Sequence, residues 1–369
     1  MRTDKRILAM GADTKSRACV CDGSGWRLGP ECGALSDVEN YRRYRAAISA
    51  LESAVGHWDL VAHDLHPQWL TTALAQSLGS PTLAVQHHHA HVAAVAAEHG
   101  DLLPIVGIAC DGVGYGSDGA SWGCEFLVVE GGQFERLGHL SYFALLGGDA
   151  AAIETWRPAL ALTVGTFGDQ WRRRAGHLFA RVPANDLACA ETMLSRTVQS
   201  PATSSLGRVF DGASYLLGLC ERNTHEAEAA AALESAAGSG AAPPYPYHTL
   251  LHGRTFEVSL SPAIEALVED VGAGGTIESV AARWHETLAH MLADGAGMTC
   301  DMAGLRRVAL AGGCFVNARL LSRTRALLEE RRLSVVLPVR QPFGDAGLAL
   351  GQAAVAAAHA ASRPKGAAR

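Results

Sequence analysis

The sequence contains no cysteine pair spaced C-x-x-C and no long hydrophobic run. Among its nine cysteines the nearest spacing is Cys19-x-Cys21, which fits neither a zinc ribbon nor a redox motif. No apolar stretch approaches the roughly 20 residues that a membrane-spanning helix needs, and the first residues fit neither a signal peptide nor an anchor. We therefore expect mostly buried free thiols, a cytoplasmic location and no membrane partner.

Charged and aromatic residues are also sparse. Of the 369 residues, 18% are charged and 6% aromatic, and 31 Lys and Arg against 37 Asp and Glu give a net charge of −6. Without a basic excess the chain is not a nucleic-acid platform, and we expect no nucleic-acid partner. The 48% of hydrophobic residues excludes a wholly disordered chain. The length predicts two domains, or one domain with two lobes.

Short apolar runs alternate with helical patterns near both ends of the chain, and a mainly helical stretch lies between them. This pattern predicts an α/β fold with two lobes and a ligand between them. We expect a first lobe over 1–101 that includes the C-terminal helix 346–369, and a second lobe over 102–345 with a helical insertion at about 150–300. Strands are expected over 7–10, 17–21, 59–63, 82–85, 105–110, 125–129, 134–140, 308–310 and 334–337.

Several helices follow from the same patterns. Ser36 and Glu39 have the spacing of a capping box and open a helix that runs to Val55. The other helices are expected over 87–99, 153–162, 169–179, 206–219, 224–237, 277–292, 318–330 and 346–358, with a frayed tail over 362–369.

The sharpest motif is Gln86-His87-His88-His89-Ala90-His91. His87 and His91 lie four residues apart on an expected helix, so they share one face with their Cβ atoms about 6 Å apart. Imidazoles at this spacing form a bidentate metal clamp, whereas the alternative is a polar helix start on the surface. No glutamate follows His87, which excludes an H-E-x-x-H protease helix. His88 and His89 are expected to point elsewhere.

Two aspartates are placed as further ligands. Asp111 ends an apolar strand, and Asp345 follows a turn after the last strand. Ligands of α/β sheets bind at the carboxyl ends of strands, so both residues suit a metal or a substrate. The capping of a turn explains each of them equally well.

Glycine-rich turns offer room for a phosphate. The run from Gly112 to Gly119 precedes a strand rather than a helix, which argues against a dinucleotide fingerprint, and the sequence has no P-loop. Backbone amides can still approach a phosphate at such glycines, and Gly312-Gly313 lies between a strand and a helix. Further along, Arg208 and Asp211 share one face of a helix, where they either pair with each other or contact a ligand.

Six motifs together resemble one family. In order along the chain they are VQHHHAHVAA, DGVGYGSDGASWGCEF, GGDAA followed by WR, TSSLGRVFD, LAGGCFVN and FGDAGLALGQ. They resemble the HypF-type carbamoyltransferases, which take part in making the cyanide ligands of nickel–iron hydrogenases. The resemblance runs from about residue 7 to residue 357. It implies the two-lobed actin-like ATPase (ASKHA) fold of sugar kinases, actin and the tRNA threonylcarbamoyl-transfer protein.

The resemblance also implies roles for particular residues. His87, His91 and Asp111 would be catalytic, and a divalent metal (Fe, Zn, Mg or Mn) would be bound by His87, His91, Asp111 and Asp345. The implied nucleotide contacts are Gly112, Gly114, Asp211, Gly312, Gly313 and Asn317. Residues Glu226–Glu228 stand where the family commonly has Gly-Gln, which adds negative charge near the implied ribose and phosphate contacts.

The implied reaction moves a carbamoyl group from carbamoyl phosphate, through carbamoyl-adenylate made with ATP, to the C-terminal cysteine of a HypE-like acceptor. The acceptor supplies the thiol, so no internal nucleophile is needed, and weak hydrolysis of carbamoyl phosphate is expected. Full-length family members also carry acylphosphatase-like, zinc-finger and YrdC-like domains, which this sequence does not contain. The YrdC-like domain makes the carbamoyl-adenylate, so we expect this chain to perform the transfer.

Three alternatives stay open. The first is an O-carbamoyltransferase that acts on a small molecule. The second is the tRNA threonylcarbamoyl-transfer protein, which the acidic charge and the HHHAH and DGVGYG motifs disfavour. The third is a non-catalytic nucleotide-binding subunit that serves as a scaffold for a partner.

Overall fold

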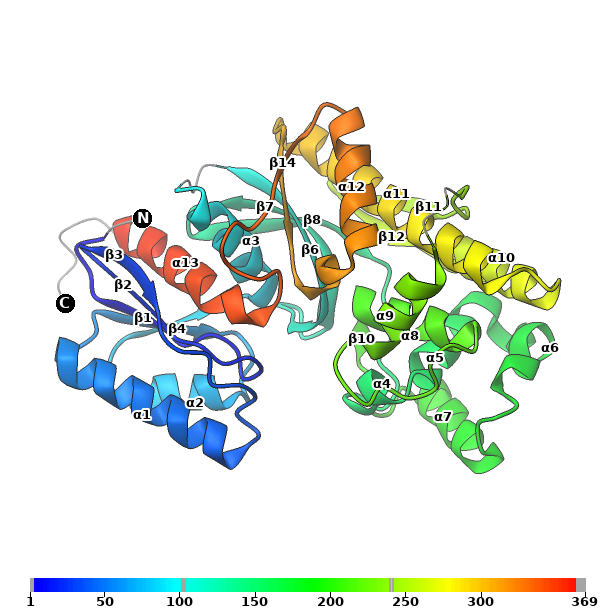
Figure 1. Cartoon of the computed structure of the whole chain (residues 1–369), viewed down its shortest axis with the longest axis horizontal. Helices are drawn as coiled ribbons and strands as arrows, with labels where there is room; N and C mark the ends of the chain where they lie inside the picture. Colours follow the sequence, from blue (N-terminus) through cyan, green and yellow to red (C-terminus); the bar gives the residue numbers. More distant parts are fainter. Residues whose placement is uncertain (1–2, 101–103, 239, 241, 363–369) are drawn as a thin grey trace.

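The computed structural model describes residues 3–100, 104–238, 240 and 242–362. Their strands form two sheets, which lie in two halves of the molecule (Figure 1). The predicted two-lobed α/β fold with a helical insertion is confirmed. No helix in the described ranges is long and apolar enough to cross a membrane, and all nine cysteines are free, six of them buried.

The first sheet has five strands in the order β3-β2-β1-β4-β5, with β1 to β3 antiparallel and β4 and β5 parallel to β1. Alternate residues along β1 face opposite layers of the core: Leu8 packs toward α1 and α2, and Ile7 toward α13. The elements are β1 (Ile7–Ala9), β2 (Cys19–Asp22), β3 (Gly25–Leu28), β4 (Leu60–Asp64), β5 (Thr82–Val85), α1 (Val38–Val55), α2 (Leu70–Ser77) and α13 (Leu348–Ser362).

The second sheet repeats this strand order. Strands β8-β7-β6-β13-β14 follow the same sequence of antiparallel and then parallel pairs, and β12 and β11 extend the sheet beyond β8. The two sheets therefore share one topology over these five strands. The strands are β6 (Ile105–Tyr115), β7 (Ser121–Glu130), β8 (Gln133–Leu140), β9 (Phe143–Ala144), β10 (Ala202–Thr203), β11 (His248–His252), β12 (Thr255–Ser259), β13 (Arg307–Ala311) and β14 (Ser334–Val336).

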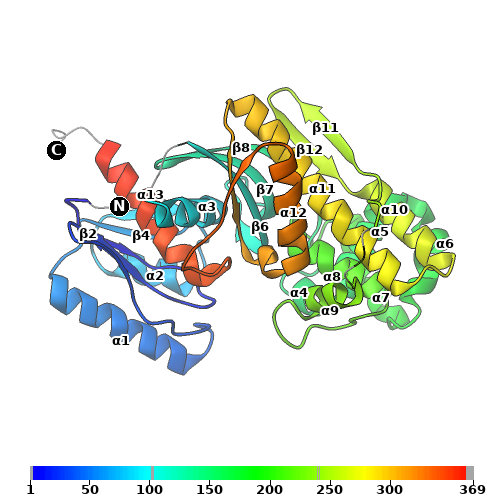
Figure 2. The ribbon, with the colours of Figure 1, turned by 45° about the horizontal axis from the view of Figure 1, so that its top comes forward.

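The helical insertion lies at the end of the second sheet that points away from the first sheet (Figures 1 and 2). Its helices are α4 (Ala150–Ile153), α5 (Trp156–Phe167), α6 (Trp171–Ala175), α7 (Ala184–Arg196), α8 (Leu206–Leu216), α9 (Glu228–Ala236) and α10 (Ser261–Gly272). Helices α11 (Ile277–Ala303) and α12 (Ala318–Glu330) pack against each other beside this sheet.

Helix α3 (His87–Glu98) lies between the two sheets and is buried on all sides. Its alanines, such as Ala90 and Ala93, pack on α13 and the first sheet, while Val92 and Val95 pack on the second sheet. A Cβ built on Gly107 of β6 would lie 2.3 Å from Val92 Cγ2, so the glycine makes room for the helix. Because α3 belongs to both cores, the division at residues 101 and 102 stays a proposal.

Several local expectations differ from the structure. The sequence patterns do not predict strand β3, the hairpin β11–β12, or helices α7 and α10. Strand β6 continues through the glycine-rich run to Tyr115. The cap of α1 is Asp37 rather than Ser36, because the Asp37 carboxylate accepts the N–H groups of Glu39 and Asn40. Helix α13 ends at Ser362, and the rest of the expected tail lies outside the described residues.

Candidate metal and nucleotide site

The four predicted metal ligands come together in the structure. The ligand atoms of His87, His91, Asp111 and Asp345 all lie within 4.8 Å of one another. His91 Nε2 lies 2.9 Å from Asp111 Oδ2 and 3.4 Å from Asp345 Oδ1. His87 Nε2 lies 3.4 and 3.5 Å from the same two oxygens.

Local structure explains why these side chains converge. Gln86 caps α3 by accepting the His89 N–H at 2.9 Å, so the helix begins at His87 and places His91 one turn later. Asp111 lies where the ladder between β6 and β7 shifts register, between Cys110 and Gly114. Asp345 opens a short 3₁₀ turn (Asp345–Gly347) in front of α13.

The other end of α3 holds the loop that leads to Asp345. The Glu98 carboxylate accepts the backbone N–H groups of Val339, Arg340 and Gln341 at 2.7 to 3.1 Å. Helix α3 therefore supplies two of the four candidate ligands directly and positions a third through its last turn.

Asp64 orients the first histidine and is not among the site residues predicted from the sequence. It is fully buried at the end of β4, and His87 Nδ1 donates to its Oδ2 at 2.8 Å. This bond fixes the proton on Nδ1 and leaves Nε2 facing Asp111 and Asp345, which is the usual arrangement behind a metal-binding histidine. Its position at the end of a strand is a signal that sequence reasoning could have used.

The charges within the cluster shift the ionisation of its members. Burial alone lowers the pKa of His87, but Asp64, Asp111 and Asp345 outweigh it and hold that pKa well above the ordinary value. Burial raises the pKa of Asp345, and the two imidazoles overcome this and depress it. Without a metal, protonated imidazole therefore balances the carboxylates. Two imidazole nitrogens and two carboxylate oxygens are also a donor set that suits a divalent cation in its place.

We expect Asp64→Asn to weaken metal binding by about 10- to 100-fold, because the amide can no longer hold His87 in the required tautomer. The measurement is a calorimetric titration of a divalent metal into the metal-free chain. Asp59→Asn is the matched control, since Asp59 just precedes β4 and bonds the N–H of Arg6 instead. Equal metal affinity of the Asp64 variant and the native chain would contradict this role.

His88 and His89 point away from the cluster, as the sequence predicts. The His88 ring lies near Trp122, and the His89 ring near Phe134. Burial lowers the pKa of His89 to about 4, so this imidazole is neutral at pH 7.

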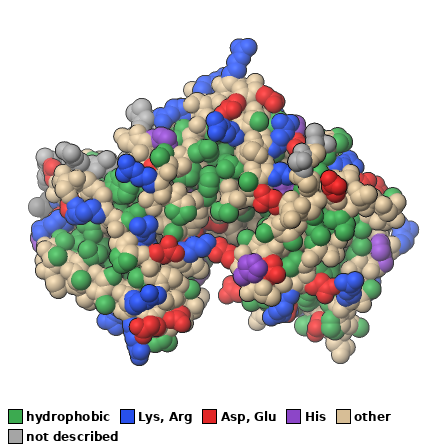
Figure 3. Space-filling model, viewed as in Figure 1, with side chains coloured by type: hydrophobic (Ala, Val, Ile, Leu, Met, Phe, Trp, Pro, Cys, Tyr) green, Lys and Arg blue, Asp and Glu red, His purple; other side chains and the backbone are tan. Residues whose placement is uncertain are grey.

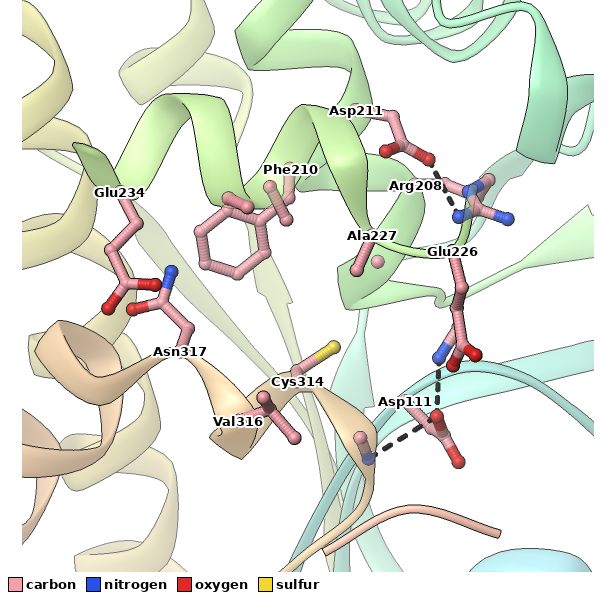
Figure 4. A pocket seen from close by; sticks show the side chains of 15 residues that line it. Asp111, Arg208, Phe210, Asp211, Glu226, Ala227, Glu234, Cys314, Val316 and Asn317 are labelled. Atoms are coloured by element: carbon pink, nitrogen blue, oxygen red, sulfur yellow. Dashed lines mark hydrogen bonds and ion pairs between the residues drawn. The ribbon is translucent and has the colours of Figure 1, made fainter. Parts of the chain in front are cut away.

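A pocket begins beside the metal cluster and extends along α8 and α9 (Figure 4). Asp111 lies at one end of it, and Glu234 and Asn317 lie together at the other. The wall between them is mainly apolar. The lining residues are Asp111, Gly112, Gly207, Arg208, Phe210, Asp211, Glu226, Ala227, Ala230, Ala231, Glu234, Gly313, Cys314, Val316 and Asn317.

Four of the six predicted nucleotide contacts line this pocket: Gly112, Asp211, Gly313 and Asn317. Gly114 lies outside it, because this glycine packs on the rings of His87 and His88. Gly312 is also not part of the lining. Its φ of +97° makes the tight turn that brings the Gly313 N–H to 3.4 Å from Asp111 Oδ1. All lining residues fall between 111 and 317, so the pocket belongs to the second lobe rather than to the space between the lobes.

Arg208 and Asp211 pair with each other and also face the pocket. Their ion pair is 2.7 Å long, and Asn223 Nδ2 donates to the other oxygen of Asp211 at 3.2 Å. Burial raises the pKa of Asp211. Ser205 caps α8 and donates to the carbonyl of Gly112, which ties this helix to the glycine-rich turn.

One cation reaches the site from the first lobe and was missed in the sequence. Lys15, in the loop after β1, pairs with Glu226 at 2.8 Å, and the neighbouring Thr14 hydroxyl donates to Asp345. Burial lowers the pKa of Lys15, but Glu226, Asp345 and Asp111 together raise it, so the amine is charged. Figure 3 shows a hollow between the two halves, with acidic and basic side chains at its upper end.

Comparison with known proteins gives a consistent result. The family model described as "HypF Kae1-like domain" matches residues 2–98, and the model "Carbamoyltransferase, Kae1-like Domain, second subdomain" matches residues 107–352. A "Carbamoyltransferase HypF homolog" of Cupriavidus necator is 41% identical over 362 residues, covering 95% of this chain and 91% of that protein. The "Carbamoyltransferase HypF" of Rhodobacter capsulatus is 37% identical over 96% of this chain.

Solved structures of HypF proteins are similar to this chain over nearly its whole length. Full-length HypF in its phosphate- and nucleotide-bound form superposes with a TM-score of 0.91 at 30% identity, covering 96% of this chain and 46% of that one. HypF of T. kodakarensis gives a TM-score of 0.87 at 28% identity, covering 97% and 48%. The chain spans about half the length of the Rhodobacter relative and of both solved structures. It therefore belongs to the HypF family of carbamoyltransferases and corresponds to the Kae1-like transferase part of that family.

Proposed function

We propose that this chain acts in the cytoplasm in nickel–iron hydrogenase maturation, transferring a carbamoyl group from carbamoyl-adenylate to the C-terminal cysteine of a HypE-like acceptor. One observation carries the proposal: Asp111 belongs to both the metal cluster and the pocket. Its Oδ2 faces His91, while its Oδ1 accepts the Gly112 N–H at 2.8 Å beside the pocket. A phosphate at this end of the pocket would lie next to the candidate metal ligands.

The reaction fits this arrangement. The acceptor sulfur bonds to the carbamoyl carbon, the bond from that carbon to the phosphate oxygen breaks, AMP leaves, and the thiol proton is released. Backbone N–H groups near Gly112 and Gly313 can bind the phosphate oxygens, and Lys15 can balance the charge that the leaving phosphate gains. A divalent metal held by His87, His91, Asp111 and Asp345 would act as a Lewis acid on carbamoyl or phosphate oxygen. The acceptor brings its own thiol, so no nucleophile of this chain is required.

The test supplies carbamoyl-adenylate and a HypE-like peptide that ends in cysteine, and follows AMP and the mass of the peptide. We expect AMP and S-carbamoylated peptide in equal amounts, at a rate on the order of 1 s⁻¹. The same peptide with the terminal cysteine replaced by serine is the control. Release of AMP at the same rate with either peptide would show hydrolysis rather than transfer. No turnover with any acceptor would favour a scaffold.

Two further arms address the substrate. Carbamoyl phosphate with ATP replaces carbamoyl-adenylate in one arm, and release of pyrophosphate there would show that the chain also performs activation. Small alcohols replace the peptide in the other arm, and carbamate formed on them would favour an O-carbamoyltransferase.

A further inference from the structure

Three half-buried rings lie beside the metal cluster and outside the pocket. They belong to His66, in the loop after β4, to Trp69, just before α2, and to Tyr115, the last residue of β6. The first two come from the first lobe and the third from the second lobe. The proposed function gives none of them a role.

The rings contact one another and the candidate metal ligand His87. His66 stacks on Trp69 with ring centroids 5.4 Å apart, and it meets Tyr115 at 5.3 Å and an angle of 70°. Trp69 in turn meets His87 at 5.8 Å and 85°. We call His66, Trp69 and Tyr115 the aromatic wall. The pocket reaches the metal cluster at Asp111, whereas the aromatic wall reaches it at His87.

The groups that place His87 also place the aromatic wall. Asp64 Oδ2 accepts from His87 Nδ1, and the other oxygen of this carboxylate accepts the His66 N–H at 2.8 Å. Gln86, which caps α3, donates from Nε2 to the Tyr115 carbonyl at 3.1 Å. The wall is therefore held in a fixed position relative to the cluster.

His66 offers one hydrogen-bond donor on this surface. The Gln68 N–H donates to His66 Nδ1 at 3.3 Å, so Nδ1 carries no proton and the neutral ring has its proton on Nε2. Within the described residues this Nε2–H has no hydrogen-bond partner. It can therefore donate to a carbonyl or carboxylate oxygen of a molecule that binds here.

The aromatic wall contains no charged side chain, and the carboxylates next to it are already engaged. Asp64 binds the two histidines, and Asp13 accepts the N–H groups of Leu70 and Thr71 at 2.7 and 2.9 Å. Flat rings with one neutral donor suit an extended peptide, whose planar groups and apolar side chains pack on the rings. They do not suit a phosphate, which binds to cations or to several N–H groups together.

We propose that the aromatic wall binds the last residues of the acceptor polypeptide and guides its cysteine to the carbamoyl group at the metal cluster. The inference rests on the proposed function, which gives the pocket to the nucleotide. The second reactant then has to reach the cluster along another surface, and the wall adjoins the cluster at His87. Because its rings come from both lobes, a peptide seated there lies across the junction between them.

The test compares two thiols, the cysteine-terminated peptide of the transfer assay and 2-mercaptoethanol, with carbamoyl-adenylate as the donor. The small thiol undergoes the same transfer but cannot cover the wall. We expect the kcat/KM of the native chain to favour the peptide by at least about a hundredfold. Trp69→Ala should lower this ratio at least about tenfold, mainly through the KM for the peptide. The helix cap is spared, since Asp13 rather than the Trp69 side chain binds the first N–H groups of α2.

His66 is tested by the same ratio. His66→Asn keeps an acceptor for the Gln68 N–H but lacks the Nε2 donor, so the preference for the peptide should fall at least about threefold. Trp26→Ala is the matched control, because Trp26 is a half-buried tryptophan on β3 that packs on the core of the first lobe. It should leave the ratio unchanged. General damage to the metal cluster would slow transfer to both thiols equally, so the ratio separates acceptor binding from a structural effect.

Each outcome has a distinct meaning. Equal kcat/KM of the native chain for the peptide and the small thiol overturns the inference and leaves the proposed function standing. An unchanged ratio in the folded Trp69→Ala chain overturns the binding role of the wall, and an unchanged ratio in His66→Asn overturns the donor role of His66. Transfer to neither thiol by the native chain overturns the proposed function and the inference with it.

Discussion

Replacing His87 and His91 together by alanine is expected to abolish stoichiometric metal binding and to lower carbamoyl transfer by about a thousandfold. The change removes two of the four candidate ligands. It also leaves Asp111 and Asp345 facing each other without the imidazoles that balance them. The measurement is elemental analysis after dialysis against Fe(II), Zn, Mn or Mg in turn, followed by the transfer assay with carbamoyl-adenylate.

His89→Phe is the matched control, because it removes an imidazole of the same motif. The His89 ring packs near Phe134, and its Nε2 has no partner in the described structure. We therefore expect this variant to bind metal in the native amount. Full metal content in the double variant would refute the assignment. Equal loss in the control would show that the motif matters for packing rather than as a clamp.

Local signals were enough to predict much of the fold and site. The spacing of His87 and His91 predicts one shared helix face, and the structure places both Nε2 atoms beside the carboxylates of Asp111 and Asp345. Strand 82–85 and helix 318–330 agree with the structure residue for residue. These features depend on hydrophobic runs and helix caps within a few neighbours, which a sequence displays directly.

Contacts between residues far apart in the sequence gave no such local signal. Asp64 contacts His87 across 23 positions, and Lys15 contacts Glu226 across 211. The first contact depends on how β4 packs beside α3, and the second on how the two lobes meet, rather than on any local pattern. Strand β11 was missed for another reason: all five of its residues are exposed, so it has no buried face to produce an alternating pattern.

The repeated strand order of the two sheets could not be predicted from the sequence either. The sheets share a topology, but their side chains pack different neighbours. Helix α3 packs on the first sheet with its alanines and on the second sheet with its valines. Because backbone hydrogen bonds define the repeat, side chains need not preserve it. The two lobes thus meet on one small-residue helix, and the site depends on how closely α13 approaches it.

Gly351→Ala is expected to destabilise the chain by about 3 kcal/mol or more and to reduce its metal content. A Cβ at position 351 would lie 1.7 Å from the Ala90 carbonyl oxygen and 2.6 Å from its carbon, so the α3 backbone itself would have to move. Helix α3 carries His87 and His91 on either side of Ala90. Denaturant unfolding gives the free energy, and elemental analysis gives the metal content.

A glycine-to-alanine substitution at another helix position should instead stabilise the chain. A Cβ on Gly297, inside α11, would meet nothing closer than Arg331 Cδ at 4.0 Å, so Gly297→Ala should stabilise the chain by up to about 1 kcal/mol through helix propensity alone. That gain is available at position 351 too, and the clash must exceed it for the expected loss to appear. If both variants proved equally stable, α13 could move away from α3 at little cost. The metal cluster would then depend on the loops around Asp111 and Asp345 rather than on the contact between these two helices.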